Sequence, residues 1–358
     1  MKKVRDSNLE LYRIIVMMVI VAHHYVVNSG LLEVMETNLS SNRTLFYYLF
    51  GLWGKVGINC FVLITGYFMC TSNITIRKFL KLLLEIEFYN VVIYFIFILT
   101  GYETITRHGL FLTFFPIQNV AYNFYSCFLL FYLCIPFLNI LIKNMDIKMH
   151  RYLIYLSLFI YSFLDIIPGV IVFTNYISWF CILYIISSYI RLYDISHKYD
   201  KKRWSLLFLF SFLIVVIGTV YIIKGNTFMG FNLNPFFFVN KPNYPLALII
   251  SLCAFNFFIN IQLKYNKYIN LIASSTFGVL LIHGNSDSMR QWLWKDVLNV
   301  PNHFYSNHFI LYAIISVLSV FTICTILDQI RIRYIEKYIF LYIDKLIEKK
   351  VNNNIKVH

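Results

Sequence analysis

The chain has 358 residues, of which 59% are hydrophobic and only 13% are charged, and its formal net charge is +14. Soluble globular domains carry roughly a quarter charged residues, so this composition excludes a soluble globule, and it is also too apolar for a disordered chain. The basic residues cluster between apolar runs, which is typical of cytosolic loops facing anionic lipid and argues against a nucleic-acid partner. We therefore expect a multi-pass protein of the cell membrane, such as the bacterial cytoplasmic membrane.

Ten apolar segments are long enough to cross a bilayer as helices, which takes about twenty residues each. In chain order they cover approximately 11–29, 45–69, 79–100, 121–142, 152–172, 176–193, 204–223, 245–263, 271–289 and 308–327. The first run has no small-residue cleavage site after it and contains two histidines, so we interpret it as a retained helix rather than a signal peptide. The expected fold is an all-α bundle of about ten transmembrane helices.

The distribution of basic residues predicts the orientation of this bundle. With the N-terminus inside, the cytosolic side collects 23 of the 31 lysine and arginine residues and the outer loops collect 6, while Arg13 and Lys55 fall within helices. This asymmetry favours ten spans with both termini cytosolic. Residues 331–358 alternate apolar and basic positions, which predicts an amphipathic, basic tail on the inner leaflet. Residues 1–330 then form one transmembrane domain.

Ionisable residues inside a membrane are costly and are therefore candidates for function. Eleven steps of 100° separate Arg13 from His24, which places both on one helix face, about 16 Å apart along the axis. His23 lies roughly 80° away and should face elsewhere. Arg13 could hold the phosphates of a cytosolic donor, while a neutral His24 in the outer half of the membrane could act as general base on a hydroxyl. Alternatively, both residues only hydrogen-bond neighbouring helices.

Further polar residues in the apolar segments have both functional and structural interpretations. Lys55 could stabilise an oxyanion, but pairing with Glu85 or Glu87 is favoured. Asn59 could bind the acyl group or the acceptor, or equally another helix. At the outer end of the 271–289 segment, polar groups could face an acceptor: His283, Asn285 and Asp287, followed by Arg290. Asp165 is better explained by a kinked helix end near Pro168.

The sequence gives no support for a metal site or a permanently bound cofactor. None of the seven cysteines has CxxC spacing, which also argues against disulfides. It contains no GxGxxG, Walker loop or HExxH motif, so nucleotide hydrolysis and metal-dependent proteolysis are not indicated.

Four stretches resemble the acyltransferase-3 family of integral membrane acyltransferases. They are NLELYR at 8–13 with His24 following, GKVGINCFVLITGYF at 54–68, FLLFYLCIPFLN at 128–139, and STFGVLLIH at 275–283. The last is similar to the late-helix motif of the polysaccharide O-acetyltransferase branch. The four motifs occur in order and span residues 8 to 283, so the resemblance covers almost the whole chain.

The resemblance implies an O-acyltransferase that moves an acetyl group from cytosolic acetyl-CoA to a hydroxyl of a cell-surface or capsular polysaccharide, or of its lipid-linked precursor. It implies that Arg13 and His24 are essential, and that basic residues opening the third helix hold the donor phosphates. Arg77, Lys78 and Lys81 occupy that place here, although ordinary inner-leaflet charge explains them equally well. Leu280 departs from the family, which frequently has a tyrosine three residues before the late histidine.

A function from another class fits the same physical pattern. Ten helices with internal charges also suit a transporter or flippase of polysaccharide intermediates, in which no acyl bond forms. Many transporters show internal repeats, and we detect none here. The absence of a repeat and the four ordered motifs favour the enzyme.

Overall fold

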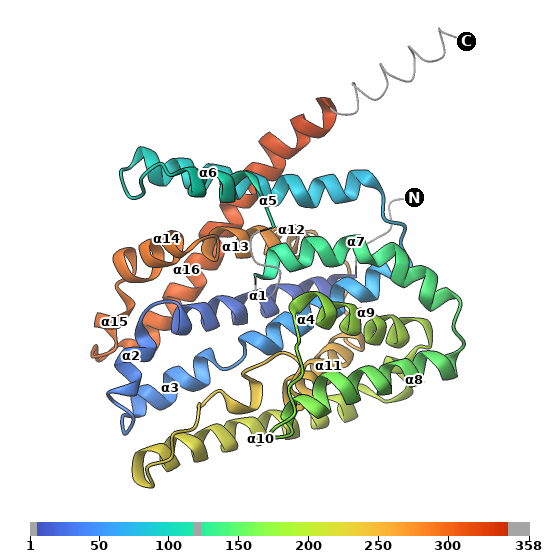
Figure 1. Ribbon diagram of the computed structural model, residues 1–358, viewed down its shortest axis with the longest axis horizontal. Coiled ribbons are helices and arrows are strands. Elements are labelled where there is room, and N and C mark those ends of the chain that lie inside the picture. The colour runs from blue at the N-terminus through green and yellow to red at the C-terminus, as the bar shows by residue number, and fades with distance from the viewer. Residues whose placement is uncertain (1–5, 118–122, 343–358) are drawn as a thin grey trace.

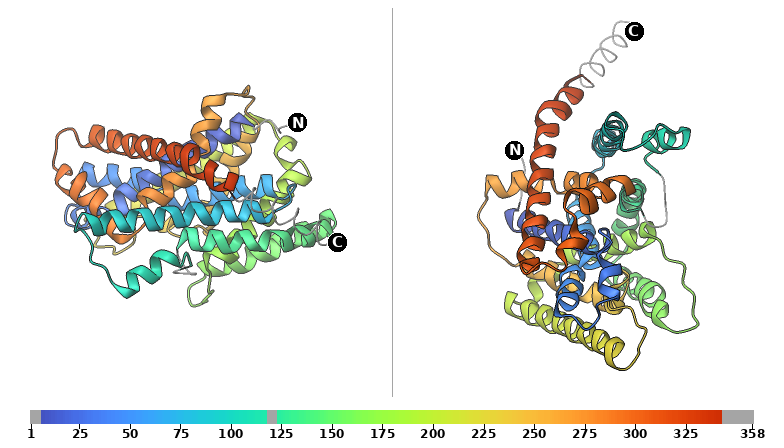
Figure 2. Two further views of the ribbon diagram at one scale, coloured as in Figure 1. Left: turned by 90° about the horizontal axis from the view of Figure 1, so that it is seen from above. Right: turned by 90° about the vertical axis from the view of Figure 1, so that its left-hand side faces the viewer.

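A computed structural model describes residues 6–117 and 123–342 of the chain (Figure 1). Within these residues every regular element is a helix and there is no strand, which confirms the all-α prediction. The long helices lie roughly side by side in a bundle, with short helices and loops at their ends (Figures 1 and 2).

The elements fall into three groups by length and type. The helices of ten residues or more are α1 Ser7–Val27, α3 Asn42–Gly51, α4 Gly54–Met69, α5 Ile76–Leu99, α7 Phe124–Lys143, α8 Ile147–Leu158, α9 Tyr176–Leu192, α10 Lys201–Phe228, α11 Pro245–Ile259 and α16 Phe309–Ile330. The shorter ones are α2 Leu31–Glu36, α6 Arg107–Phe114, α12 Lys267–Ala273, α13 Thr276–His283, α14 Asp287–Arg290 and α15 Val300–His303. Turns of π-helix cover Phe159–Phe163, Gln291–Val297 and Arg331–Glu336, and 3₁₀ turns cover Leu164–Ile166, Ile195–Lys198 and Phe237–Val239.

Six helical stretches in the described part of the chain are long and apolar enough to cross a membrane. They are Ser7–Val27, Asn42–Met69, Ile76–Leu99, Phe124–Lys143, Lys201–Phe228 and Phe309–Tyr342. The apolar helices α9 and α11 are shorter. These lengths support a multi-pass membrane protein, while the count of ten spans and the cytosolic termini stay predictions. The predicted segment 152–172 is interrupted, because α8 passes into a π turn and a 3₁₀ turn that contains Asp165.

The predicted segment 271–289 is also divided, into α12 and α13. The division falls at Ser274 and Ser275, and Gln329 of α16 stabilises it. The Gln329 side-chain amide donates to the Leu271 carbonyl and to both serine hydroxyls, at 2.7–3.0 Å. A broken helix leaves backbone carbonyl groups without partners, which is costly inside a membrane. The Gln329 amide supplies a hydrogen bond to one of them, the Leu271 carbonyl. The break sets the position of α13 independently of α12.

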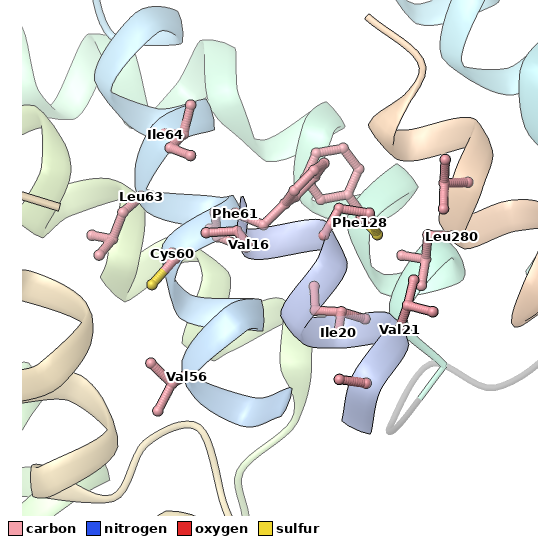
Figure 3. Packing of buried hydrophobic residues seen from close by; sticks show 14 of the residues in the cluster. Val16, Ile20, Val21, Val56, Cys60, Phe61, Leu63, Ile64, Phe128 and Leu280 are labelled. Atoms are coloured by element: carbon pink, nitrogen blue, oxygen red, sulfur yellow. The ribbon is translucent and has the colours of Figure 1, made fainter. Parts of the chain in front are cut away.

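Helix α1 lies inside the bundle and packs against α3, α4, α11, α12, α13 and α16. Its contact with α4 is close because α4 presents glycines. A Cβ on Gly57 would lie only 2.8 Å from Ile20 Cγ1, so only glycine fits there without a shift. Apolar side chains of the two helices fill the remaining space, among them Val16 and Ile20 of α1 and Phe61 of α4 (Figure 3).

The amphipathic tail expected from residue 331 onward stays a prediction, because only its first part is described. Helix α16 continues through the π turn to Tyr342, and residues 343–358 lie outside the described part. Arg331 was assigned to the inner-leaflet surface, but its side chain is only 5% exposed. It pairs with Glu85 of α5 at 3.0 Å and with Asp328 at 2.8 Å. The buried carboxylates therefore draw Arg331 into the bundle.

Candidate active site

Five helix ends enclose a cavity of about 270 Å³. It is lined by the end of α1, the beginnings of α4, α7 and α9, and the segment from α13 to α14. In the orientation predicted from the basic residues, all five ends lie on the outer side of the membrane. The polar lining residues are His23, His24, Asn28, Lys55, Asn123, Tyr125, Tyr176, Asn285 and Arg290. Ile20 and Leu280 contribute apolar surface and appear in Figure 3.

Two asparagines fix the helix starts that form one wall of this cavity. Asn123 caps α7 by accepting from the Ser126 backbone N–H, and Asn175 caps α9 by accepting from the Ser178 backbone N–H. Asparagine is favoured at these positions because its side chain pairs a donor that the helix leaves free. The second cap places Tyr176, the first residue of α9, against the cavity.

His24 and His283 form a hydrogen-bonded pair at the cavity. His24 Nδ1 lies 2.9 Å from His283 Nε2, and His283 Nδ1 lies 2.6 Å from the Val279 carbonyl oxygen. A carbonyl only accepts, so His283 Nδ1 carries the proton and, in the neutral ring, Nε2 is the acceptor. His24 Nδ1 must then donate, which leaves a lone pair on His24 Nε2. That nitrogen has no hydrogen-bond partner among the described residues.

His23 also lines the cavity, so the expectation that it faces elsewhere is wrong. Its Nδ1 lies 2.6 Å from the Gly51 carbonyl oxygen, and its ring sits on Gly54, where a Cβ would come within 2.2 Å of the ring. The missing side chain at position 54 gives the ring room beside α4. A histidine tied to the backbone in this way serves helix packing.

The favoured pairing of Lys55 with Glu85 is wrong. The Lys55 ammonium donates to the Tyr176 hydroxyl at 2.9 Å, while Glu85 pairs with Arg331. The reason is the position of Lys55 in the first turn of α4, beside the cavity. Among the described residues Lys55 forms no ion pair. Its charge therefore faces the cavity.

The remaining predicted acceptor residues separate into two groups. Asn285 lines the cavity, and its amide donates to Asn90 of α5 at 3.2 Å. Asn59 is buried away from it, where it accepts from the Trp179 indole and donates to the Pro242 carbonyl, which is an inter-helix role. The Asp287 side chain is 98% exposed and pairs with Arg290 at 2.6 Å. The structure thus brings His24, His283, Lys55 and Asn285 together, but not Asn59 or Asp287.

Sequence reasoning missed Tyr176 as a site residue, whereas Arg290 was expected only as one of the polar groups near the late histidine. Tyr176 was hidden in an aromatic-rich segment, where interfacial belts give the same pattern. Arg290 follows the late histidine by seven positions and was also counted among the outer-loop charges. Its place in the cavity depends on the short helix α14, which returns the chain toward the bundle.

The predicted donor-binding residues lie toward the other end of the bundle and have different partners. Arg13 pairs with Glu10 at 3.2 Å. On α5, Lys78 donates to the Asn73 carbonyl, Lys81 pairs with Glu336 at 2.5 Å, and Arg77 lies over the ring of Phe340. Two of the three α5 residues are thus engaged by the helical extension of α16.

The face of α1 between Arg13 and His24 is closed by apolar side chains. Met17 and Ile20 occupy the intervening turns and are 0% and 3% exposed. Arg13 does not line the cavity at His24. In this conformation the cavity lies at the end of the bundle that carries His24, and the α1–α4 core separates it from Arg13.

Within the described residues, no group of three or more His, Cys, Asp or Glu side chains is arranged to hold a metal ion.

Comparison with known proteins supports an assignment of family. No curated protein and no solved structure matches the chain. The model of one protein family does match, over residues 6–329, and it is described as an acyltransferase domain. The chain therefore belongs to the acyltransferase-3 family, and this membership implies a membrane acyltransferase.

Proposed function

We propose that this protein transfers an acetyl group from cytosolic acetyl-CoA to a hydroxyl of a cell-surface or capsular polysaccharide, or of its lipid-linked precursor. The observation that carries this proposal is the His24–His283 pair, which leaves an unprotonated His24 Nε2 at a cavity between outer helix ends. The likeness of 275–283 to the polysaccharide O-acetyltransferase branch supports the choice of acceptor.

The tautomers suit general-base catalysis by His24. Its Nε2 takes the proton of the acceptor hydroxyl while that oxygen attacks the thioester carbonyl carbon. The His24 imidazolium that forms keeps its Nδ1–H bond to His283, which holds the ring in position as the third member of a catalytic triad does. When the C–S bond breaks, the proton passes from Nε2 to the thiolate and gives free CoA.

In this mechanism the Tyr176 hydroxyl, which lines the same cavity, stabilises the charge that develops on the acyl oxygen. It accepts a hydrogen bond from the Lys55 ammonium at 2.9 Å, so its own proton is free to be donated. An accepted bond from a cation strengthens the hydroxyl as a donor. Donors of this kind, fixed in a site with little water, contribute more than they would in solution.

The donor is proposed to bind from the cytosolic side, with its phosphates near Arg13 and the start of α5. Arginine suits this role because guanidinium matches phosphate geometry, and Arg77, Lys78 and Lys81 add positive charge. The acyl arm would follow α1 for about 16 Å to reach His24. Because Met17 and Ile20 are buried in this conformation, transfer requires the α1–α4 contact to open.

Membranes that contain His24→Ala test the mechanism. We expect transfer of radiolabelled acetyl groups from acetyl-CoA to surface glycan to fall roughly 10²- to 10⁴-fold, which is the usual contribution of a general base. His108→Ala is the matched control, because His108 is exposed on α6, and His23→Ala should be milder. Full activity of His24→Ala at normal protein amounts would end this mechanism. Proton NMR of the glycan from cells with and without the gene tests the acceptor class.

A further inference from the structure

The charges at the cavity are strongly one-sided. Its lining includes the cations Lys55 and Arg290, and no Asp or Glu is among the described residues that line it. Lys55 bonds to a neutral tyrosine. Arg290 forms an ion pair at 2.6 Å with Asp287, whose side chain is 98% exposed and does not line the cavity. Lys55 thus faces the cavity without an acidic partner among the described residues, and Arg290 adds a guanidinium whose carboxylate partner is exposed to solvent.

A neutral sugar in this space would leave the Lys55 charge without a counter-ion. Partly burying a cation is costly unless an anion or several hydrogen bonds compensate it. A carboxylate or phosphate provides that compensation, and arginine offers it two parallel hydrogen bonds. Positive charge in a cleft also concentrates anions from solution. The charge of Lys55 therefore favours an anionic occupant over a neutral one, and Arg290 can add hydrogen bonds to it.

A second cavity extends from the first at Lys55. It has a volume of about 240 Å³, shares Lys55 and Tyr176 with the first, and is further lined by Thr174, Asn175, Trp179, Asn240, Lys241 and Asn243. Its own lysine is already neutralised, because Lys241 pairs with Asp165 at 2.9 Å. Its wall is rich in amides, which suit sugar hydroxyls. Lys55 thus lies between a space beside the histidines and a space for a neighbouring unit.

We infer that the acceptor is an acidic glycan chain, whose carboxylate or phosphate group binds between Lys55 and Arg290 while the adjacent unit occupies the second cavity. This inference rests on the proposed function and adds the chemical class of its acceptor. The anionic group holds the reacting unit in the first cavity so that one of its hydroxyls faces His24 Nε2.

Equilibrium binding to the purified full-length protein tests the inference without acyl transfer. The probes are D-glucuronate and glucose 1-phosphate, with glucose as the neutral match, and the readout is the shift in melting temperature with probe concentration. We expect at least one anionic sugar to stabilise the protein and glucose to have no effect at the same concentration. Lys55→Gln and Arg290→Gln should each weaken anionic binding at least about tenfold, as expected when a charged hydrogen bond is lost. Lys224→Gln and Arg107→Gln, which change exposed cations elsewhere, should not.

Three results would overturn the inference: equal binding of glucose, anionic binding that survives both cavity substitutions, or no binding of either anionic sugar. A second arm compares acetyl transfer to the native glycan before and after chemical reduction of its carboxyl groups. A tenfold lower rate on the reduced glycan supports a carboxylate, whereas an unchanged rate together with glucose 1-phosphate binding assigns the site to a phosphate. If Lys55→Gln impairs only succinyl-CoA as donor, the anion belongs to the acyl group and the inference is wrong.

The two proposals fail separately. Suppose that anionic sugars bind in a way that depends on Lys55 and Arg290, but that no glycan is acetylated. This result would support the anion-binding site and refute the proposed acyltransferase function. Acetyl transfer at equal rates to acidic and neutral glycans would keep the function and remove the acidic acceptor.

Discussion

His24 Nδ1 and His283 Nε2 lie 2.9 Å apart, although 259 residues separate them in the chain. Two nitrogens at this distance share one proton, so the two rings cannot both be fully protonated. The Val279 carbonyl decides which nitrogen donates, because it takes the His283 Nδ1–H. A backbone oxygen on α13 thereby fixes the tautomer of a side chain on α1.

The first prediction concerns His283 as a hydrogen-bond acceptor. His283→Gln keeps an oxygen that can accept from His24 Nδ1, whereas His283→Leu fills similar space without an acceptor. We expect His283→Leu to lower kcat at least about tenfold, since a base held in the wrong tautomer loses activity, and His283→Gln to keep several times more activity than His283→Leu. Equal activity of the two variants at equal protein amounts would mean that His283 only fills space.

The second prediction separates two roles of Arg13. If it binds the donor, Arg13→Gln raises the KM for acetyl-CoA and leaves the acceptor KM unchanged. Glu10, its partner at 3.2 Å, provides the control. Because a donor-binding arginine is needed whether or not Glu10 is charged, the double variant Glu10→Gln/Arg13→Gln should stay impaired. Recovery in the double variant would show that Arg13 is needed only to neutralise Glu10.

The third prediction concerns the length of the acyl group. Ile20 lines the cavity between His24 and the Met17 side of α1, where the acyl chain is proposed to arrive. Ile20→Ala removes three carbons there, so we expect the kcat/KM for butyryl-CoA relative to acetyl-CoA to rise about tenfold, within the range that methylenes contribute in apolar pockets. Ile14→Ala, a similar buried change nearer the cytosolic end of α1, should leave the ratio unchanged. An unaltered ratio in Ile20→Ala would place the acyl group elsewhere.

The fourth prediction is one of stability. Arg331→Met leaves the buried carboxylates of Glu85 and Asp328 without their cation. Removal of one partner from a buried ion pair typically costs about 3–5 kcal/mol, so the unfolding temperature in detergent should fall markedly. Arg333→Met changes an exposed arginine two positions away, and such changes usually stay within about 0.5 kcal/mol. Similar unfolding temperatures for the two variants would mean that the cluster contributes little.

Much of the fold follows from local patterns, because apolar length alone indicates a membrane helix. The break at Ser274 and Ser275 was not predictable, since it depends on Gln329, which lies more than fifty residues later in the chain. Burial of Arg331 was missed for a similar reason. Its basic neighbours indicated a surface tail. Only the structure shows that Arg331 forms ion pairs with Glu85 of α5 and with Asp328 of α16.

The relative positions of candidate site residues could be predicted from the sequence when the residues lie on the same helix. Regular helix geometry places Arg13 and His24 on one face, and the late motif indicates His283. Contacts between helices were not predictable from spacing, so the expected Lys55–Glu85 pair was wrong and Tyr176 went unnoticed as its partner. Asn59 was a candidate for substrate binding because it lies in a motif, but its buried amide accepts a hydrogen bond from the Trp179 indole.

The distance along the chain between the two paired histidines also affects how the protein is made. A ribosome completes α1 long before it reaches residue 283, so a partly synthesised chain cannot hold the His24 ring in the tautomer described above. Until the late helices have entered the bilayer, the nascent protein lacks the paired base. A chain released too early would therefore lack the paired histidine on which the proposed mechanism depends.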